Sequence, residues 1–172
     1  QILVGDDVVA ESRSDLVLLA ANEWMNDPSC FDSLASFVLA NSKAIAPILV
    51  TARQILKERT GDSATQGYQS KNSNPNRIME IAEAVYDAIR SIEIDYSNPP
   101  AAFENHVQKI RTPRQIVEGK SGTCLDTTVL YAACLAQCGL DPFLVLVKGH
   151  AFSGFFSLEN ADRYLAKTVI DD

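Results

Sequence analysis

Two side chains of this sequence are suited to nucleophilic catalysis, the thiol of Cys124 and the imidazole of His150. Cys124 opens an apolar segment that runs to Gly139 and is predicted to form one buried helix. The first turn of a helix leaves backbone N–H groups unpaired and carries partial positive charge, which stabilises a thiolate. His150 follows Gly149 at the predicted beginning of a strand. A thiol on a helix N-terminus and a histidine entering a strand together indicate a thiol-dependent acyl-transfer site.

Three further residues are candidates for supporting such a site. Thr123 and Asp126 flank the thiol in the first helical turn. Asp126 stabilises the helix, but its negative charge opposes a thiolate. Gln108 lies upstream in a segment predicted to be irregular, where its amide could donate a hydrogen bond to the oxyanion; the alternative is an exposed loop glutamine. Gly122 is expected to leave room for a substrate carbonyl.

A third catalytic group should orient the imidazole. If residues 165–171 return antiparallel to residues 150–156, Asp171 lies opposite His150, whereas Asp172 faces the other side. The alternatives are a solvated surface acid at Asp171 and an acid beyond residue 172. For Cys124 and His150, taken singly, the alternative is a structural role.

The hydrophobic pattern predicts the elements that must position these groups. Helices are expected over residues 31–39, 42–59, 74–92, 112–119 and 123–138, and strands over residues 2–9, 143–147 and 150–156. We therefore predict an α+β fold in which helices pack on a small antiparallel sheet, with residues 165–171 as its third strand. A single domain over residues 1–172 is expected, with about residues 1–25 as an N-terminal strand extension.

Charge and composition exclude several classes of function. The formal net charge is −7 and the pI is about 4.8, which argues against nucleic-acid binding by this chain. No apolar run reaches the roughly 20 residues that cross a membrane.

His106, Lys109 and Arg111 are interpreted as surface residues. Because the chain opens without methionine and stops in a strand-like run, we expect it to be part of a longer protein.

Four cysteines are too sparse for a disulfide scaffold: Cys30, Cys124, Cys134 and Cys138. We interpret the buried ones as free thiols of a reducing compartment, and so expect a cytoplasmic protein. A zinc site built from three of these cysteines and His150 is the alternative, but it lacks the C-x₂-C spacing of such sites. No cofactor is expected.

Several short segments resemble the transglutaminase-like branch of the papain-like thiol superfamily. The closer likeness is to an uncharacterised transglutaminase-like module of large bacterial proteins, often found beside a superfamily 1 helicase. The resemblance covers about residues 16–157 and rests on six blocks: residues 22–24, 67–70, 98–100, 108–113, 122–126 and 149–152. The last two blocks are the most specific. Phe152 stands where the larger family often has tryptophan.

The resemblance implies that Cys124 is the nucleophile and His150 the general base, whereas the aspartate does not carry over and Asp171 stays a positional choice. It implies a papain-like core, a thioester intermediate, and a peptide or protein substrate for a protease, amidase or transglutaminase-like acyltransferase. The competing hypothesis is an inactive module that binds proteins within a larger helicase-associated protein. In both cases the expected partners include other domains of the same chain, but neither nucleic acid nor membrane.

Overall fold

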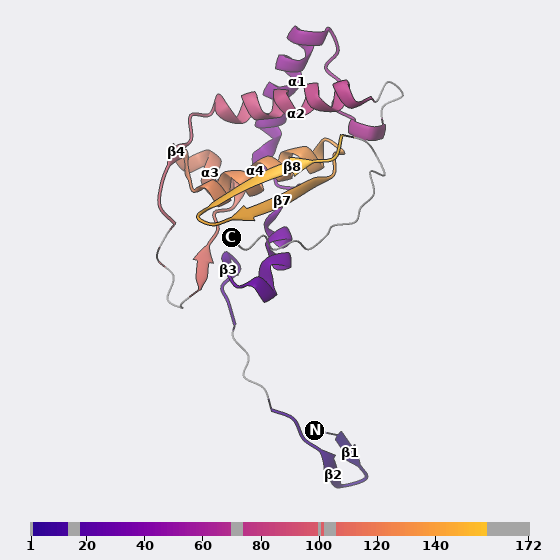
Figure 1. Cartoon of the computed structure of the whole chain (residues 1–172), viewed down its shortest axis with the longest axis vertical. Helices are drawn as coiled ribbons and strands as arrows, with labels where there is room; N and C mark the ends of the chain where they lie inside the picture. Colours follow the sequence, from indigo (N-terminus) through magenta and orange to yellow (C-terminus); the bar gives the residue numbers. More distant parts are fainter. Residues whose placement is uncertain (1, 14–17, 70–73, 100, 102–105, 158–172) are drawn as a thin grey trace.

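Three helices form the centre of the computed structural model: α1 (Ala46–Thr60), α2 (Pro75–Arg90) and α4 (Cys124–Gln137) (Figure 1). The structure describes residues 2–13, 18–69, 74–99, 101 and 106–157. Together with four small sheets, these helices give an α+β fold, as predicted. α1 packs on α2, and α2 packs on α4.

The helix ends follow signals that the sequence contains. α2 begins after Asn74, whose side chain accepts a hydrogen bond from the backbone N–H of Arg77. The short helix α3 (Pro113–Gly119) begins with a capping box between Thr112 and Gln115. After α4 the chain turns at Gly139, which has a left-handed φ of 72°. The predicted positions of these helices are therefore confirmed to within two residues.

α4 is apolar on nearly all sides because it lies between two hydrophobic clusters. The larger cluster joins α4 to α1 and α2, and contains Leu56, Ile81, Val85, Leu130 and Leu135 among its fully buried residues. The smaller cluster lies on another side of α4 and comprises Trp24, Leu34, Ile110, Leu125, Val129 and Ala151. Because Leu125 follows Cys124 and Ala151 follows His150, we call this smaller group the site cluster.

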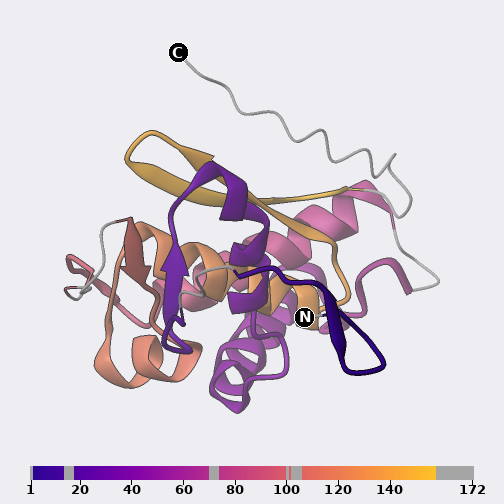
Figure 2. The same ribbon diagram turned by 90° about the horizontal axis from the view of Figure 1, so that it is seen from below.

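The antiparallel hairpin of β7 (Pro142–Val147) and β8 (His150–Phe155) lies against α4. Figure 2 shows it as a twisted two-stranded ribbon alongside that helix. In this register Leu146 is opposite Ala151, and Val147 is opposite His150. Since successive side chains of a strand point to opposite faces, buried Ala151 faces α4 and exposed His150 lies on the other face.

The end of this hairpin is fixed by a turn that only glycine fits. Gly67 has a φ of 53°, and a Cβ atom there would lie 2.4 Å from the carbonyl oxygen of Gly139. The neighbouring Tyr68 hydroxyl donates a hydrogen bond to the carbonyl oxygen of Phe156. It also accepts one from the backbone N–H of Asp141, at 3.4 Å. The 3-10 segment η3 (Gly67–Gln69) is thus hydrogen-bonded to both strands at the open end of the hairpin, just before β7 and just after β8.

Two other strand pairs were not predicted. β3 (Glu23–Met25) pairs antiparallel with β5 (Val107–Lys109), and β4 (Asp95–Tyr96) pairs in parallel with β6 (Ser121–Gly122). The described strands therefore form four separate two-stranded sheets rather than one small sheet. These strands have only two or three residues, too few for an alternating hydrophobic pattern to be recognised.

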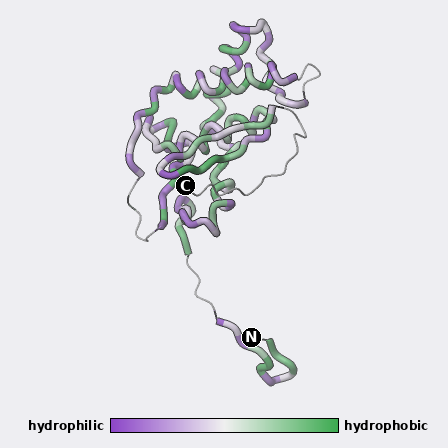
Figure 3. Tube along the Cα trace, viewed as in Figure 1, coloured by the Kyte–Doolittle hydropathy of each residue, from purple (hydrophilic) through white to green (hydrophobic). Residues whose placement is uncertain are grey.

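The predicted N-terminal strand is a hairpin of β1 (Ile2–Val4) and β2 (Asp7–Ala10) that stands apart from the rest of the structure (Figure 1). Its apolar side chains are exposed. The green colour of this part of the tube in Figure 3 marks the hydrophobic residues of the hairpin. The remaining short elements are 3-10 helices, η1 (Pro28–Phe37) and η2 (Lys43–Ile45). The returning segment predicted over residues 165–171 falls outside the described residues. Among the described helices, none is both long and apolar enough to cross a bilayer.

Candidate functional site

Cys124 is the first residue of α4 and is half-buried. The preceding Thr123 caps the helix: its hydroxyl accepts a hydrogen bond from the Asp126 N–H at 3.0 Å, and the Asp126 carboxylate accepts one from the Thr123 N–H at 2.9 Å. Within the described part of the chain, the N–H groups of Cys124 and Leu125 have no acceptor. They are the two donors that the first turn of α4 can offer to an oxyanion.

The Asp126 carboxylate is fully buried beneath this first turn. Besides the Thr123 N–H, it accepts hydrogen bonds from the backbone N–H of Arg111 at 2.7 Å and from the Arg111 guanidinium at 2.8 Å. The same guanidinium donates to the carbonyl oxygen of Asn98 at 3.3 Å. The sequence-based interpretation of Arg111 as a surface residue is therefore wrong, since only 19% of its side chain is exposed.

This ion pair changes the expected role of Asp126. The negative charge of its carboxylate is compensated by the Arg111 guanidinium in direct contact, so it is not an unpaired negative charge next to the thiol. The contacts also join the chain after β5 to the start of α4. Asp126 therefore supports the site by holding the first turn of α4 in place.

Gly122 supports the same turn by close packing. A Cβ atom at this position would lie 3.3 Å from the Cβ of Asp126 and 3.6 Å from a methyl group of Thr127. The space that the sequence suggested for a substrate carbonyl is thus occupied by the helix itself. A side chain at Gly122 would push against the turn that carries Cys124.

The hairpin meets α4 one turn after Cys124, at Thr128. The Thr128 hydroxyl lies 2.7 Å from the carbonyl oxygen of Cys124 and 2.9 Å from that of Ala151. This buried contact brings the backbone beside His150 to the helix turn that carries the thiol. The imidazole itself lies on the exposed face, and among the described residues neither the thiol nor the imidazole has a hydrogen-bond partner. Thr128 was missed by the sequence analysis, although it stands four residues after Cys124 and so on the same helix face.

Gln108 lies on strand β5, not in irregular chain as expected. It is directly opposite Trp24 of β3 and half-buried, so it shares the face that carries this buried ring. Trp24 belongs to the site cluster with Leu125 and Ala151. Gln108 therefore lies on the side of β5 that faces the site cluster.

The other predicted groups do not join this arrangement. Cys134 and Cys138 are buried free thiols; burial raises the pKa of Cys134 to about 12 and that of Cys138 to about 11. In the described part of the chain, no three histidine, cysteine or acidic residues lie close enough to hold a metal ion, which contradicts the zinc alternative. Asp171 lies outside the described residues.

A family model described as a transglutaminase-like domain matches residues 64–153, just over half of the chain. The match includes Gln108, Cys124 and His150. No curated protein and no solved structure matches the chain. The chain therefore belongs to the transglutaminase-like domain family.

Proposed function

We propose that this domain is a cysteine-dependent acyl-transfer enzyme in which Cys124 is the nucleophile and His150 the general base. The observation that carries the proposal is the contact of Thr128 with the carbonyl oxygens of both Cys124 and Ala151. It connects the two chain segments that the chemistry requires.

The chemistry follows from the first turn of α4. The Cys124 thiol loses its proton to the His150 imidazole, and the thiolate sulfur attacks a substrate carbonyl carbon. The resulting oxyanion is stabilised by the free N–H groups of the first turn and by the Gln108 amide. The intermediate collapses to a thioester as the leaving group takes the proton from the imidazolium. Water or a second amine then cleaves the thioester, so hydrolysis and transfer share the first half-reaction.

A peptide or protein is the substrate class that we propose, on the strength of the family. The finer assignment to a papain-like core and a setting among other domains of a longer, helicase-associated chain rests on the sequence resemblance alone. Asp171 is retained as the proposed third group on its predicted register opposite His150.

A second function, that of an inactive protein-binding module, is favoured by the position of His150. Ala151 rather than His150 faces α4, and the exposed imidazole has no described partner. In this alternative the acyl-transfer fold is kept as a rigid scaffold, and the exposed face of the β7–β8 hairpin contacts another protein.

Acylation by an activated ester separates the two functions. p-Nitrophenyl acetate should transfer its acetyl group to the Cys124 sulfur and release one equivalent of p-nitrophenolate in a burst. Peptide mapping should find the acetyl group on Cys124, and hydroxylamine should remove it. Cys124→Ser should abolish the burst, while Cys30→Ser, at the other half-buried cysteine, should leave it unchanged. Equal acetylation of Cys30 and Cys124 would instead favour the inactive module.

A further inference from the structure

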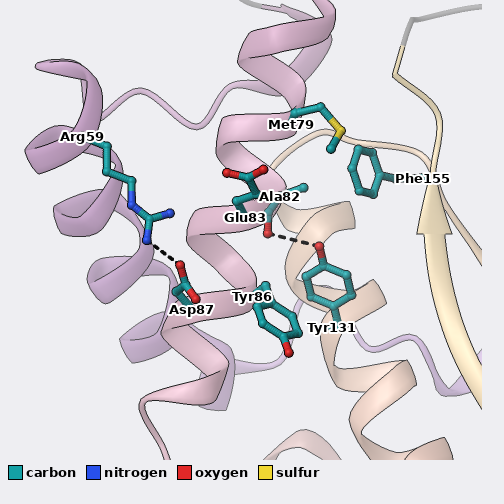
Figure 4. A pocket seen from close by; sticks show the side chains of 8 residues that line it. All are labelled: Arg59, Met79, Ala82, Glu83, Tyr86, Asp87, Tyr131 and Phe155. Atoms are coloured by element: carbon teal, nitrogen blue, oxygen red, sulfur yellow. Dashed lines mark hydrogen bonds and ion pairs between the residues drawn. The ribbon is translucent and has the colours of Figure 1, made fainter.

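A pocket of about 550 Å³ lies away from the candidate active site, and neither Cys124 nor His150 lines it. One wall is a stripe of α2 formed by Met79, Glu83 and Tyr86, which share a face because they are spaced by four and three residues. The opposite wall is formed by Tyr131 of α4 and Phe155 of β8 (Figure 4). The pocket size is that of a small-molecule site.

Two of the aromatic rings that line this pocket pack against each other. Tyr86 and Tyr131 meet edge to face, with ring centroids 6.3 Å apart and ring planes at 84°. The Tyr131 hydroxyl donates a hydrogen bond to the carbonyl oxygen of Ala82 at 3.1 Å, which fixes its ring (Figure 4). Burial raises the pKa of Tyr131 to about 12, so the phenol keeps its proton and this hydrogen bond well above neutral pH.

The charges around the pocket favour a cation. The Arg59 guanidinium is paired with the Asp87 carboxylate at 2.5 Å, so the opposite charges of these two lining residues cancel. Glu83 is exposed and forms no hydrogen bond or ion pair with any described residue. The lining therefore carries one net negative charge, next to rings whose faces are themselves electron-rich.

We propose that this pocket binds an alkylated ammonium group, with three aromatic rings around the cation and the Glu83 carboxylate as its counter-ion. Such a cation needs no hydrogen-bond acceptors, whereas a bare lysine ammonium has three donors to satisfy. Its methyl groups match the thioether of Met79 and the ring of Phe155, and its charge is attracted by the ring faces. The group can be carried by a small molecule such as choline or by a trimethylated lysine of a protein.

The chain offers a built-in probe, because Met79 lines the pocket while Met25, its only other methionine, lies on β3. With isotope-labelled methionine methyl groups, choline should shift the Met79 signal saturably and leave the Met25 signal in place. The neutral isostere of choline, with carbon in place of the quaternary nitrogen, should bind at least about fivefold more weakly. Choline and a peptide containing trimethyl-lysine form the two arms, and the tighter ligand identifies the source.

Two exposed positions allow substitutions that preserve the fold. Glu83→Gln should weaken choline binding about threefold, whereas Glu58→Gln, which removes the same charge from α1 outside the pocket, should not. Tyr86→Leu should weaken it about fivefold while keeping apolar volume. Equal binding of choline and its neutral isostere, equal shifts of both methionines, or no saturable shift of Met79 would overturn the proposal. None of these readouts depends on Cys124.

Discussion

Arg111 and Asp126 form an ion pair beneath the first turn of α4, with a guanidinium nitrogen 2.8 Å from a carboxylate oxygen that is fully buried. The pair connects two segments fifteen residues apart, and the backbone N–H of Arg111 donates to the same carboxylate. Because Cys124 lies on this turn, the position of its thiol depends on a charge pair buried beneath it.

Removal of one partner from this pair should destabilise the domain strongly. Asp126→Ala leaves a largely buried guanidinium and two backbone N–H groups without their acceptor, so we expect a loss of about 3 kcal/mol in the free energy of unfolding. Urea denaturation followed by circular dichroism measures this loss. The double variant Arg111→Met/Asp126→Leu should lose less than the sum of the two single variants. A loss below about 1 kcal/mol for Asp126→Ala would contradict the assigned role.

The four thiols should differ in reactivity in a way that burial alone does not explain. Cys134 and Cys138, with raised pKa values of about 12 and about 11, should resist iodoacetamide at neutral pH. Cys30 and Cys124 are both half-buried, but only Cys124 begins an α-helix, whereas Cys30 lies in the first turn of the 3-10 helix η1, which the Asp27 carboxylate caps. Peptide mapping of the labelled protein should therefore find Cys124 modified faster than Cys30. The reverse order would remove the basis for choosing Cys124 as nucleophile.

Alkaline pH should weaken the fold through the buried groups of α4. The pKa of the Cys134 thiol rises from 9.0 to about 12 on folding, so above about pH 9 the unfolded chain loses a proton that the folded chain keeps. Stability is thus fully present below that pH and falls as the pH rises toward 12. Urea midpoints at about pH 8 and about pH 10 should differ less in Cys134→Ala than in the wild type. Equal pH dependence in both proteins would show that Cys134 is not the group responsible.

Gly67 offers a test of the turn that anchors the hairpin. Gly67→Ala places a methyl group 2.4 Å from a backbone oxygen at a positive φ, so a loss of at least about 2 kcal/mol is expected. Gly61→Ala is the matched control, because Gly61 also has a positive φ but open space around it. It should lose only about 1 kcal/mol. Equal losses would mean that backbone strain alone, and not the close contact, accounts for the effect.

Local signals in the sequence were sufficient for the longer elements. The Asn74 and Thr112 caps, the proline residues after them and the apolar helix that ends before Gly139 all predicted elements that the structure contains. Short-range patterns decide such features, so no knowledge of distant contacts was needed.

The features that the sequence did not reveal depend on distant contacts. The strand that carries Gln108 is three residues long and exists because it pairs with β3, more than eighty positions away. Arg111 looked like a surface residue because nothing near it in the sequence indicates that Asp126 lies buried beside it. The face on which His150 lies follows from the burial of Ala151 with Leu125 and Val129 of α4, a contact between distant segments of the chain.

The pH dependence of Cys124 alkylation in the presence and absence of the His150 imidazole tests the central claim most directly. His150→Asn removes the proposed base, and His106→Asn is the matched control because it removes the only other imidazole at a position whose φ of 64° asparagine tolerates. If Cys124 and His150 form a catalytic pair, His150→Asn should slow the alkylation of Cys124 at pH 7 about tenfold and change the pH dependence of its rate. His106→Asn should leave the profile unchanged. Overlapping profiles for wild type and His150→Asn, with identical circular dichroism spectra, would contradict the account and leave the domain as a binding module with an acyl-transfer fold.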